Sequence, residues 1–191
     1  MSGRFQPVLT CPRFYVSLCP QSAIRDDNPV VVLEHELMYG VTFKMSEAAQ
    51  KDDFYVPFGK AKLEKEGTDV TIISYSRAVG KCIEAAEALA ADGVSAEVIN
   101  LLSIRPMDRD AIIKSVMKTN RCITVEEGWP VCSIGNHISA VLMQEAFDYL
   151  DAPVINCTGK DVPMPYAANL EKLALITTGE VVAAVHQVTY R

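Results

Sequence analysis

The stretch VTIISYSRAVGKCIEAAEALAADG, residues 70–93, decides the fold because the spacing of its apolar residues changes partway along it. Residues 70–75 form a β-branched apolar run that is typical of a buried strand. From residue 78 onward the apolar residues recur at helical spacing, and Gly93 follows where a left-handed residue commonly ends a helix. A strand followed by a helix is therefore predicted, with an edge strand at 60–64 before it.

The same alternation of strand and helix continues to the end of the chain. Apolar runs predict further strands at 95–101, 122–125 and 154–158. Helices are expected from Asp108 onward, across 134–142, and after the capping box formed by Thr177 and Glu180. Because parallel neighbours need crossover helices, this order predicts an α/β fold at residues 60–191: a three-layer domain with a mostly parallel sheet and helices on both faces.

The sequence before residue 60 is less regular. Residues 30–33 predict a strand buried on both faces, which follows the turn residues 26–29. The polar residues 46–59 predict a linker between this strand and the α/β domain.

Length and composition exclude several classes of protein. The 191 residues fit one domain, or one domain plus a fragment, and 49% hydrophobic residues exclude wholesale disorder. The net charge of −6 provides no basic field, so nucleic acid is not an expected partner. The longest aliphatic run, residues 30–33, is far too short to span a membrane.

The six cysteines contain no C-x-x-C pair, which argues against a zinc clip or a thioredoxin-type redox motif. Cys82, Cys122 and Cys157 fall within apolar periodic segments, where a cysteine is usually a small buried hydrophobic residue. We expect reduced cysteines and an intracellular protein.

Candidate functional residues lie just after the predicted strands, because ligands of such sheets gather at the carboxyl ends of the strands. Glu126 and Glu127 follow the strand at 122–125, but adjacent residues of an extended segment point to opposite sides, so a structural or partner contact is favoured over catalysis. Arg105 is expected either to bind an anion or to stabilise its own loop through an ion pair with an acidic residue, and the second role is favoured. His35 follows a predicted strand, where it serves proton transfer or only marks the return of the chain to water.

Longer strings of sequence carry more information than spacing does. Six of them stand in the order and rough spacing found in the beta subunits of pyruvate dehydrogenase complexes: SAIRD (22–26), NPVVVLE (28–34), ELMYG (36–40), IRPMD (104–108), TVEEGWP (124–130) and DVPMPYA (161–167). The chain resembles this family over residues 22–191, and the last string resembles the mitochondrial type rather than the branched-chain relative.

The resemblance implies a domain organisation. Residues 22–45 would be a remnant of the family's pyrimidine-binding domain, 46–59 the linker, and 60–191 a transketolase C-terminal-type domain. Residues 1–21 match nothing in the family, and they stand where members have the glutamate that contacts thiamine diphosphate. We therefore expect no catalytic or cofactor-binding residue in this chain, and expect it to be a truncated product, an alternative transcript or an incomplete gene model.

The resemblance also implies an activity and partners. Members decarboxylate pyruvate with thiamine diphosphate and pass the acetyl group to lipoyl groups of the acyltransferase, in the mitochondrial matrix. Two beta subunits pair with two alpha subunits, and the acyltransferase binds through its subunit-binding domain. A potassium ion is held in the family by the segment that matches Ala23, Ile24, Asp26 and Asn28, whose carbonyl and carboxylate oxygens suit a hard cation.

Two other hypotheses stay open. The chain could be a non-catalytic interaction module, inactive alone, that pairs beta subunits or docks the acyltransferase on an acidic face near Asp148, Asp151 and Arg191. So short an N-terminal part should leave apolar surface of the strand at 30–33 exposed, which would favour association. An unrelated α/β ligand-binding domain would require the matching strings to be coincidence.

Overall fold

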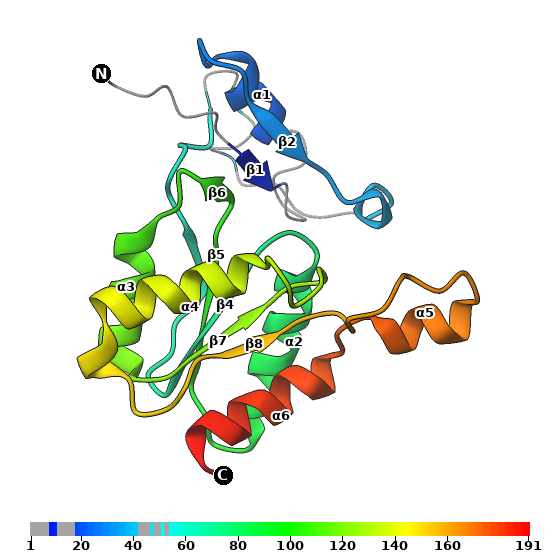
Figure 1. Cartoon of the computed structure of the whole chain (residues 1–191). Helices are drawn as coiled ribbons and strands as arrows, with labels where there is room; N and C mark the ends of the chain where they lie inside the picture. Colours follow the sequence, from blue (N-terminus) through cyan, green and yellow to red (C-terminus); the bar gives the residue numbers. More distant parts are fainter. Residues whose placement is uncertain (1–7, 11–17, 42–46, 48–50, 52–53) are drawn as a thin grey trace.

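The computed structural model describes residues 8–10, 18–41, 47, 51 and 54–191, and Figure 1 shows that they form a large α/β layer structure beneath a smaller N-terminal part. The larger sheet has the strand order β3-β5-β4-β7-β8, in which β3 is antiparallel to β5 and the other neighbours are parallel. Its strands are β3 (Lys62–Lys65), β4 (Val70–Ser74), β5 (Ala96–Asn100), β7 (Cys122–Val125) and β8 (Ile155–Cys157). The predicted α/β class, with a mostly parallel sheet, is confirmed.

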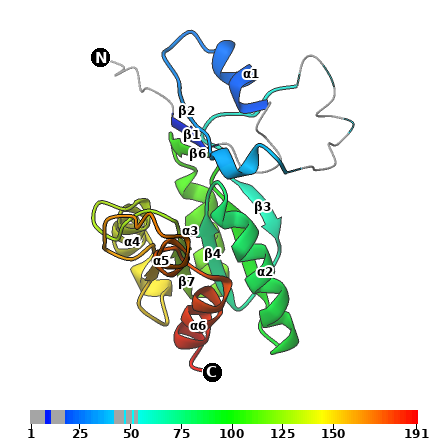
Figure 2. The ribbon, with the colours of Figure 1, turned by 90° about the vertical axis from the view of Figure 1, so that its right-hand side faces the viewer.

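Helices cover both faces of this sheet (Figures 1 and 2). α2 (Ala78–Ala91) and α6 (Thr178–Thr189) pack on one face, and α3 (Arg109–Thr119) and α4 (Ile134–Glu145) pack on the other. The alternation of side chains along a strand explains the two cores: Ile72 of β4 packs with α2 and α6, whereas its neighbour Ile73 packs with α3 and α4. The three layers therefore follow from apolar residues on both faces of every central strand.

Three helices begin or end at the residues that the sequence predicts, because the local sequence contains capping residues or a glycine there. Gly93, with φ of +73°, follows the end of α2. The Asp108 carboxylate caps α3 by accepting a hydrogen bond from the backbone N–H of Ala111. Thr177 and Glu180 form the complete capping box at the start of α6.

A second, three-stranded sheet has the order β2-β1-β6. β1 (Val8–Thr10) pairs parallel with β2 (Val31–Leu33) and antiparallel with β6 (Ser103–Arg105), which joins this sheet to the α/β domain. α1 (Leu18–Ile24) ends just before the turn at residues 26–29. Three short helical segments were not predicted: η1 (Glu36–Met38), η3 (Phe147–Tyr149) and α5 (Ala168–Ala174). In Figure 1, α5 extends away from the rest of the domain.

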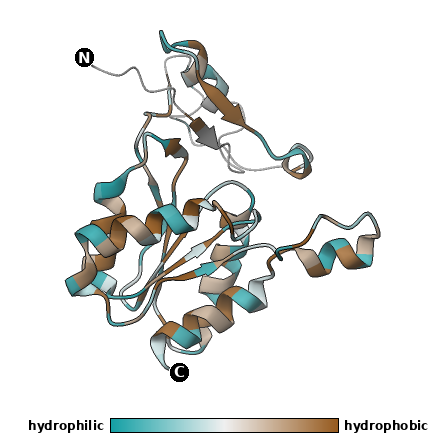
Figure 3. Ribbon diagram, in the orientation of Figure 1, coloured by the Kyte–Doolittle hydropathy of each residue, from teal (hydrophilic) through white to brown (hydrophobic). Residues whose placement is uncertain are grey.

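The prediction that the strand at 30–33 is buried on both faces is wrong. Val31 and Leu33 of β2 are 47% and 51% exposed, because β2 lies at the edge of a small three-stranded sheet. Figure 3 shows β2 coloured as hydrophobic. Apolar surface is therefore exposed on this strand, as we expected for so short an N-terminal part.

The edge strand β3 differs from β2 in its side chains. Its sequence is KLEK, and its pairing with β5 shifts register between Leu63 and Lys65. Of the predicted linker, residues 46, 48–50 and 52–53 lie outside the described residues. Within the described part of the chain, no helix has both the length and the apolar character that crossing a membrane requires.

Candidate binding site at the carboxyl edge of the sheet

The carboxyl ends of β4 and β7 lie side by side in the larger sheet, so the residues that follow them converge at one edge. Tyr75, Ser76 and Arg77 follow β4, and Ser76 has a φ of +54°, in the left-handed region. Glu126 and Glu127 follow β7. This edge therefore gathers two carboxylates, a phenol and a guanidinium.

Glu126 is 3% exposed and fully engaged in local hydrogen bonds. Its Oε2 accepts a hydrogen bond of 2.7 Å from the Tyr75 hydroxyl, and its Oε1 accepts one of 2.8 Å from the backbone N–H of Gly135 in the first turn of α4. Helix N-termini stabilise carboxylates in this way. Burial, together with the Glu126 carboxylate, raises the pKa of Tyr75, so the phenol stays protonated and donates.

Glu127 forms a separate network that connects the N-terminal part to the domain. Its Oε2 lies 3.0 Å from Nε2 of His35, and its Oε1 lies 3.0 Å from Nζ of Lys81 and 3.3 Å from Nη1 of Arg77. The Lys81 ammonium also donates to the backbone carbonyl of Ile176, at 2.7 Å. As the sequence predicts, the two adjacent carboxylates have different partners and do not form an acid/base pair.

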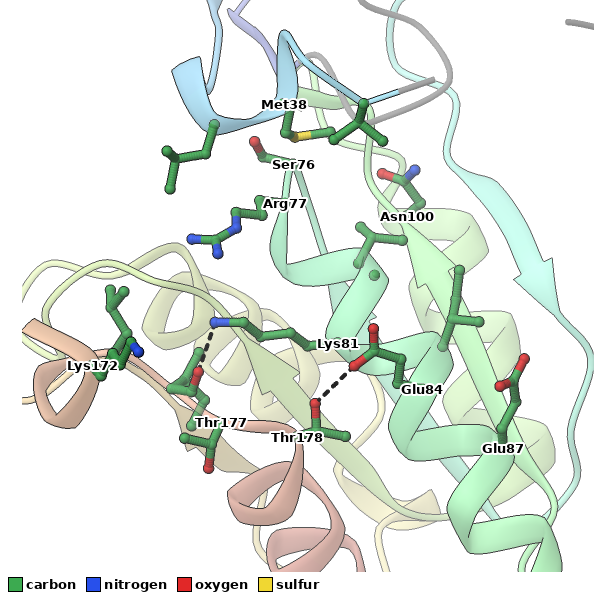
Figure 4. A pocket seen from close by; sticks show the side chains of 17 residues that line it. Met38, Ser76, Arg77, Lys81, Glu84, Glu87, Asn100, Lys172, Thr177 and Thr178 are labelled. Atoms are coloured by element: carbon green, nitrogen blue, oxygen red, sulfur yellow. Dashed lines mark hydrogen bonds between the residues drawn. The ribbon is translucent and has the colours of Figure 1, made fainter. Parts of the chain in front are cut away.

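A pocket of about 930 Å³ lies beside this network, between η1, α2 and the segment that joins α5 to α6 (Figure 4). Arg77 at the N-cap of α2, Lys81 of α2 and Lys172 of α5 contribute its positive charges. Met38 and several aliphatic side chains contribute apolar wall. The arrangement can hold a small molecule that is anionic at one end.

The four residues assigned to a potassium ion lie at the end of α1 and in the turn after it. The backbone N–H of Asp26 donates to the carbonyl of Ala23 at 3.3 Å, and Asp26 Oδ1 accepts hydrogen bonds of 2.8 and 2.9 Å from the backbone and side chain of Asn28. Ala23, Asp26 and Asn28 are thus brought together, while the Ile24 side chain is 82% exposed.

The donor atoms of these residues are oxygens. They belong to backbone carbonyls and one carboxylate, which are the hard oxygen ligands that alkali and alkaline-earth cations prefer. Among the residues that the structure describes, no group of three or more His, Cys, Asp or Glu side chains is arranged to hold a metal ion.

The other sequence candidates lie elsewhere. Arg105 is on β6 in the small sheet, and not at the carboxyl edge of the large one. On the surface near η3, Asp151 Oδ2 lies 3.3 Å from Arg121 Nη2, and Asp148 is exposed. The Arg191 guanidinium donates to the carbonyls of Asp92 and Gly93.

The three cysteines predicted to be buried are buried and free of disulfides. Burial raises the pKa of the Cys82 thiol to about 12 and that of the Cys157 thiol to about 11. At neutral pH both stay thiols, so neither is a nucleophile.

A mostly parallel sheet with helices on both faces and polar residues gathered at its carboxyl edge defines a three-layer α/β domain. The family described as "Transketolase, C-terminal domain" matches residues 59–181, so this chain belongs to the transketolase C-terminal domain family.

Curated relatives show which members of this family the chain is similar to. The mitochondrial pyruvate dehydrogenase E1 component subunit beta of Dictyostelium discoideum is 56% identical over 171 residues, which cover 90% of this chain and 48% of the relative. The corresponding proteins of Chaetomium thermophilum and Homo sapiens are 59% and 53% identical, over 82% and 86% of this chain and 41% and 46% of their own lengths. The resemblance to pyruvate dehydrogenase beta subunits is confirmed, and the chain spans about half the length of these relatives.

A solved structure described as "Split gene transketolase, inactive beta4 tetramer" has the same arrangement of elements. It superposes with a TM-score of 0.76 and 29% sequence identity, covering 97% of this chain and 57% of that one. The likeness therefore includes the N-terminal part as well as the α/β domain.

Proposed function

We propose that this chain supplies the C-terminal part of the beta subunit of a pyruvate dehydrogenase. The whole enzyme would use thiamine diphosphate to decarboxylate pyruvate and would transfer the acetyl group to lipoyl groups of an acyltransferase. The proposal rests on one observation: identity of 53–59% to mitochondrial pyruvate dehydrogenase E1 beta subunits over more than four-fifths of the chain. By the same resemblance, its location would be the mitochondrial matrix.

In this function the chain would act as a structural and pairing domain. We propose no catalytic and no cofactor-binding residue among the residues that the structure describes. Thiamine diphosphate would be held by the alpha subunit and by a pyrimidine-binding domain. The chain alone is therefore expected to be inactive.

Co-purification with a pyruvate dehydrogenase alpha subunit tests this role. We expect a tagged alpha subunit to retain the chain, and calorimetry of the chain alone with thiamine diphosphate and magnesium to give no saturable heat. Failure of the alpha subunit to retain the chain would contradict the pairing role. Micromolar binding of the cofactor to the chain alone would contradict the assignment of the cofactor site elsewhere.

We also propose a weak potassium site at Ala23, Ile24, Asp26 and Asn28. Potassium in place of lithium should raise the melting temperature by only about 1–2 °C, because stabilisation by a weakly bound ion grows slowly with its concentration. Asp26→Ala should abolish this shift, and the matched variant of the exposed neighbour, Asp27→Ala, should keep it. A shift that survives Asp26→Ala would exclude the site.

A second candidate function is pairing between copies of the chain. Apolar side chains are exposed along the arm that carries α5: Val162 45%, Met164 53%, Tyr166 104%, Leu170 48% and Leu173 69%. Such a patch is typical of an interaction surface. Light scattering should detect a dimer that Leu173→Asp dissociates, and a wild-type chain that is monomeric at high concentration would contradict this candidate.

The acyltransferase is a third proposed partner, on the acidic surface near Asp148 and Asp151. Its basic subunit-binding domain should be captured at low salt and released as salt rises, because exposed charges are screened. Capture that is independent of salt, or unaffected by Asp148→Lys, would argue against this surface.

A further inference from the structure

The pocket beside Glu127 has the size and the walls of a small-molecule site. Its volume of about 930 Å³ lies near the upper end of the range of roughly 300–1,000 Å³ that ligand pockets occupy. Three elements far apart in the sequence build it, namely η1, α2 and the segment from α5 to α6. None of the functions proposed above uses this pocket.

Positive charge is concentrated on one side of the pocket. Figure 4 shows Arg77, Lys81 and Lys172 together on that side. Glu127 binds Arg77 and Lys81 and fixes their positions, whereas Lys172 has no hydrogen-bond or ion-pair partner among the described residues. Arg77 has five N–H donors and uses one nitrogen on Glu127, so its remaining donors are available to an anion. A planar guanidinium and a lysine on the same side of a pocket suit a phosphate group.

The opposite side of the pocket is acidic. Glu84 and Glu87 of α2 lie there, as Figure 4 shows, and Glu84 accepts a hydrogen bond of 3.1 Å from the Thr178 hydroxyl. Carboxylates repel an anion but accept hydrogen bonds from hydroxyl and amino groups. The two ends of the pocket therefore select a ligand with an anionic end and a donor-bearing end.

The rest of the lining is mainly apolar and partly bare backbone. Met38 is 6% exposed, and it lines the pocket together with Val79, Ile83 and Leu175. Gly80 also lines it, and a Cβ atom added at Gly80 would meet nothing within 4 Å. A flat apolar group can approach the α2 backbone there without a clash.

We propose that this pocket binds a nucleoside phosphate. The phosphate would lie against Arg77 and Lys172, and the base would lie over Gly80 and against Met38. The hydroxyl and amino groups of the nucleoside would donate to Glu84 and Glu87. A nucleoside phosphate combines a phosphate anion, a flat base and several hydrogen-bond donors, which match the cationic, apolar and acidic parts of this lining.

Calorimetry of the full chain with ADP, in the presence of EDTA, tests the proposal. ADP should bind at least about tenfold more tightly than inorganic phosphate or adenosine, because each of these lacks one half of the contacts. Absence of saturable ADP binding would overturn the proposal. Equal affinity for phosphate alone, or for adenosine alone, would overturn it as well.

Two variants locate the site. Lys172→Glu should weaken ADP binding about tenfold or more, since it reverses an unpaired charge at the phosphate. Gly80→Leu fills the pocket and should abolish binding while the helix is kept, because leucine is a better helix former than glycine. Lys172 is exposed, and a side chain at Gly80 would enter open space, so both variants should fold. A melting temperature close to that of the wild type would verify this.

Matched controls come from the same chain. Lys114→Glu reverses an exposed lysine on α3, on the other face of the sheet, and Gly179→Leu fills open space in the first turn of α6 outside the pocket. Both should leave ADP affinity within about twofold of the wild type. If the pocket variants bind ADP as these controls do, the site lies elsewhere and the proposal is wrong. If Gly80→Leu does not fold, Lys172→Glu decides alone.

Discussion

The N-terminal part and the α/β domain are held together by different forces. In the described part of the chain, Met38 and Val56 are the buried hydrophobic residues that precede residue 70, whereas all the others lie within residues 70–188, most of them in the two cores of the domain. Among the described residues, the N-terminal part is instead attached to the domain by polar contacts, such as that from His35 to Glu127, and by the pairing of β1 with β6. These contacts help to position the N-terminal part, while the domain is stabilised by burial.

The largest effect should come from a core substitution. Ile72→Ala, at a side chain that is fully buried between β4 and α2, should lower the free energy of unfolding by about 3–4 kcal/mol. Leu33→Ala removes a similar volume from half-exposed β2 and should cost less than about 1 kcal/mol. Urea unfolding measures both. Equal decreases in the free energy of unfolding would show that the N-terminal part and the α/β domain share one core, and would contradict the difference described above.

A buried polar cluster should have the next largest effect. Glu97, 3% exposed on β5, accepts hydrogen bonds from the Ser115 hydroxyl, from Lys118 and, at 3.3 Å, from the backbone N–H of Gly67. Glu97→Ala removes the acceptor that these donors share and should cost about 2–3 kcal/mol. The exposed ion pair of Glu145 with Arg109 offers a control, since Glu145→Ala should cost less than about 1 kcal/mol. If Glu97→Ala lowers the free energy of unfolding no more than Glu145→Ala does, the buried cluster does not stabilise the protein more than the exposed ion pair.

Glu127 tests the attachment of the N-terminal part. Glu127→Gln weakens the contacts to His35, Arg77 and Lys81, and should cost about 1.5 kcal/mol. Hydrogen exchange should quicken mainly in residues 35–41, because His35 is held there by this carboxylate. Glu171→Gln, at an exposed acid of α5, should change neither quantity. Unchanged exchange in residues 35–41 would mean that Glu127 does not attach this segment.

The smallest effect should come from the capping box of α6. Thr177→Ala should cost about 1 kcal/mol, since the Thr177 hydroxyl accepts from the Glu180 backbone. Burial raises the pKa of Glu180, but hydrogen bonds with Lys160 and Thr177 outweigh it and lower the pKa overall. The stability from Glu180 is therefore present above its unfolded pKa and lost as the pH falls through its folded pKa.

A pH titration of stability separates this contribution. Between about pH 6 and pH 3, the free energy of unfolding should fall less steeply in Glu180→Gln than in the wild type. Identical slopes would show that the carboxylate of Glu180 has the same pKa in the folded and unfolded chains.

Sequence patterns predict the domain well because its signals are local. The apolar runs of β4 and β7, the end of α2 at Gly93 and the caps of α3 and α6 are each encoded within a few residues. The short β6 and α5 escaped prediction for opposite reasons. Three-residue β6 exists through its pairing with the distant β1, and seven-residue α5 has exposed leucines in place of an apolar stripe that packs.

The site was predicted in part. The position after a strand identified Glu126, Glu127 and His35 as candidates, and the structure brings His35 and Glu127 together across 92 residues. Arg77, Lys81 and Lys172 were missed because helical lysines and arginines are usually solvated. These three residues line one pocket only because α2 and α5 lie close together in the fold, and the spacing of residues along one helix does not predict which helices lie close together.

The two edge strands differ in how they would meet a second molecule. β3 has lysines at Lys62 and Lys65 and an irregular register, which are features that discourage a foreign strand from adding to a sheet. β2 is a regular edge with the exposed apolar residues Val31 and Leu33 and no charged residue. We therefore expect insolubility of the chain, where it arises, to begin at β2, and a lysine at Val31 to act as a gatekeeper that keeps the protein in solution.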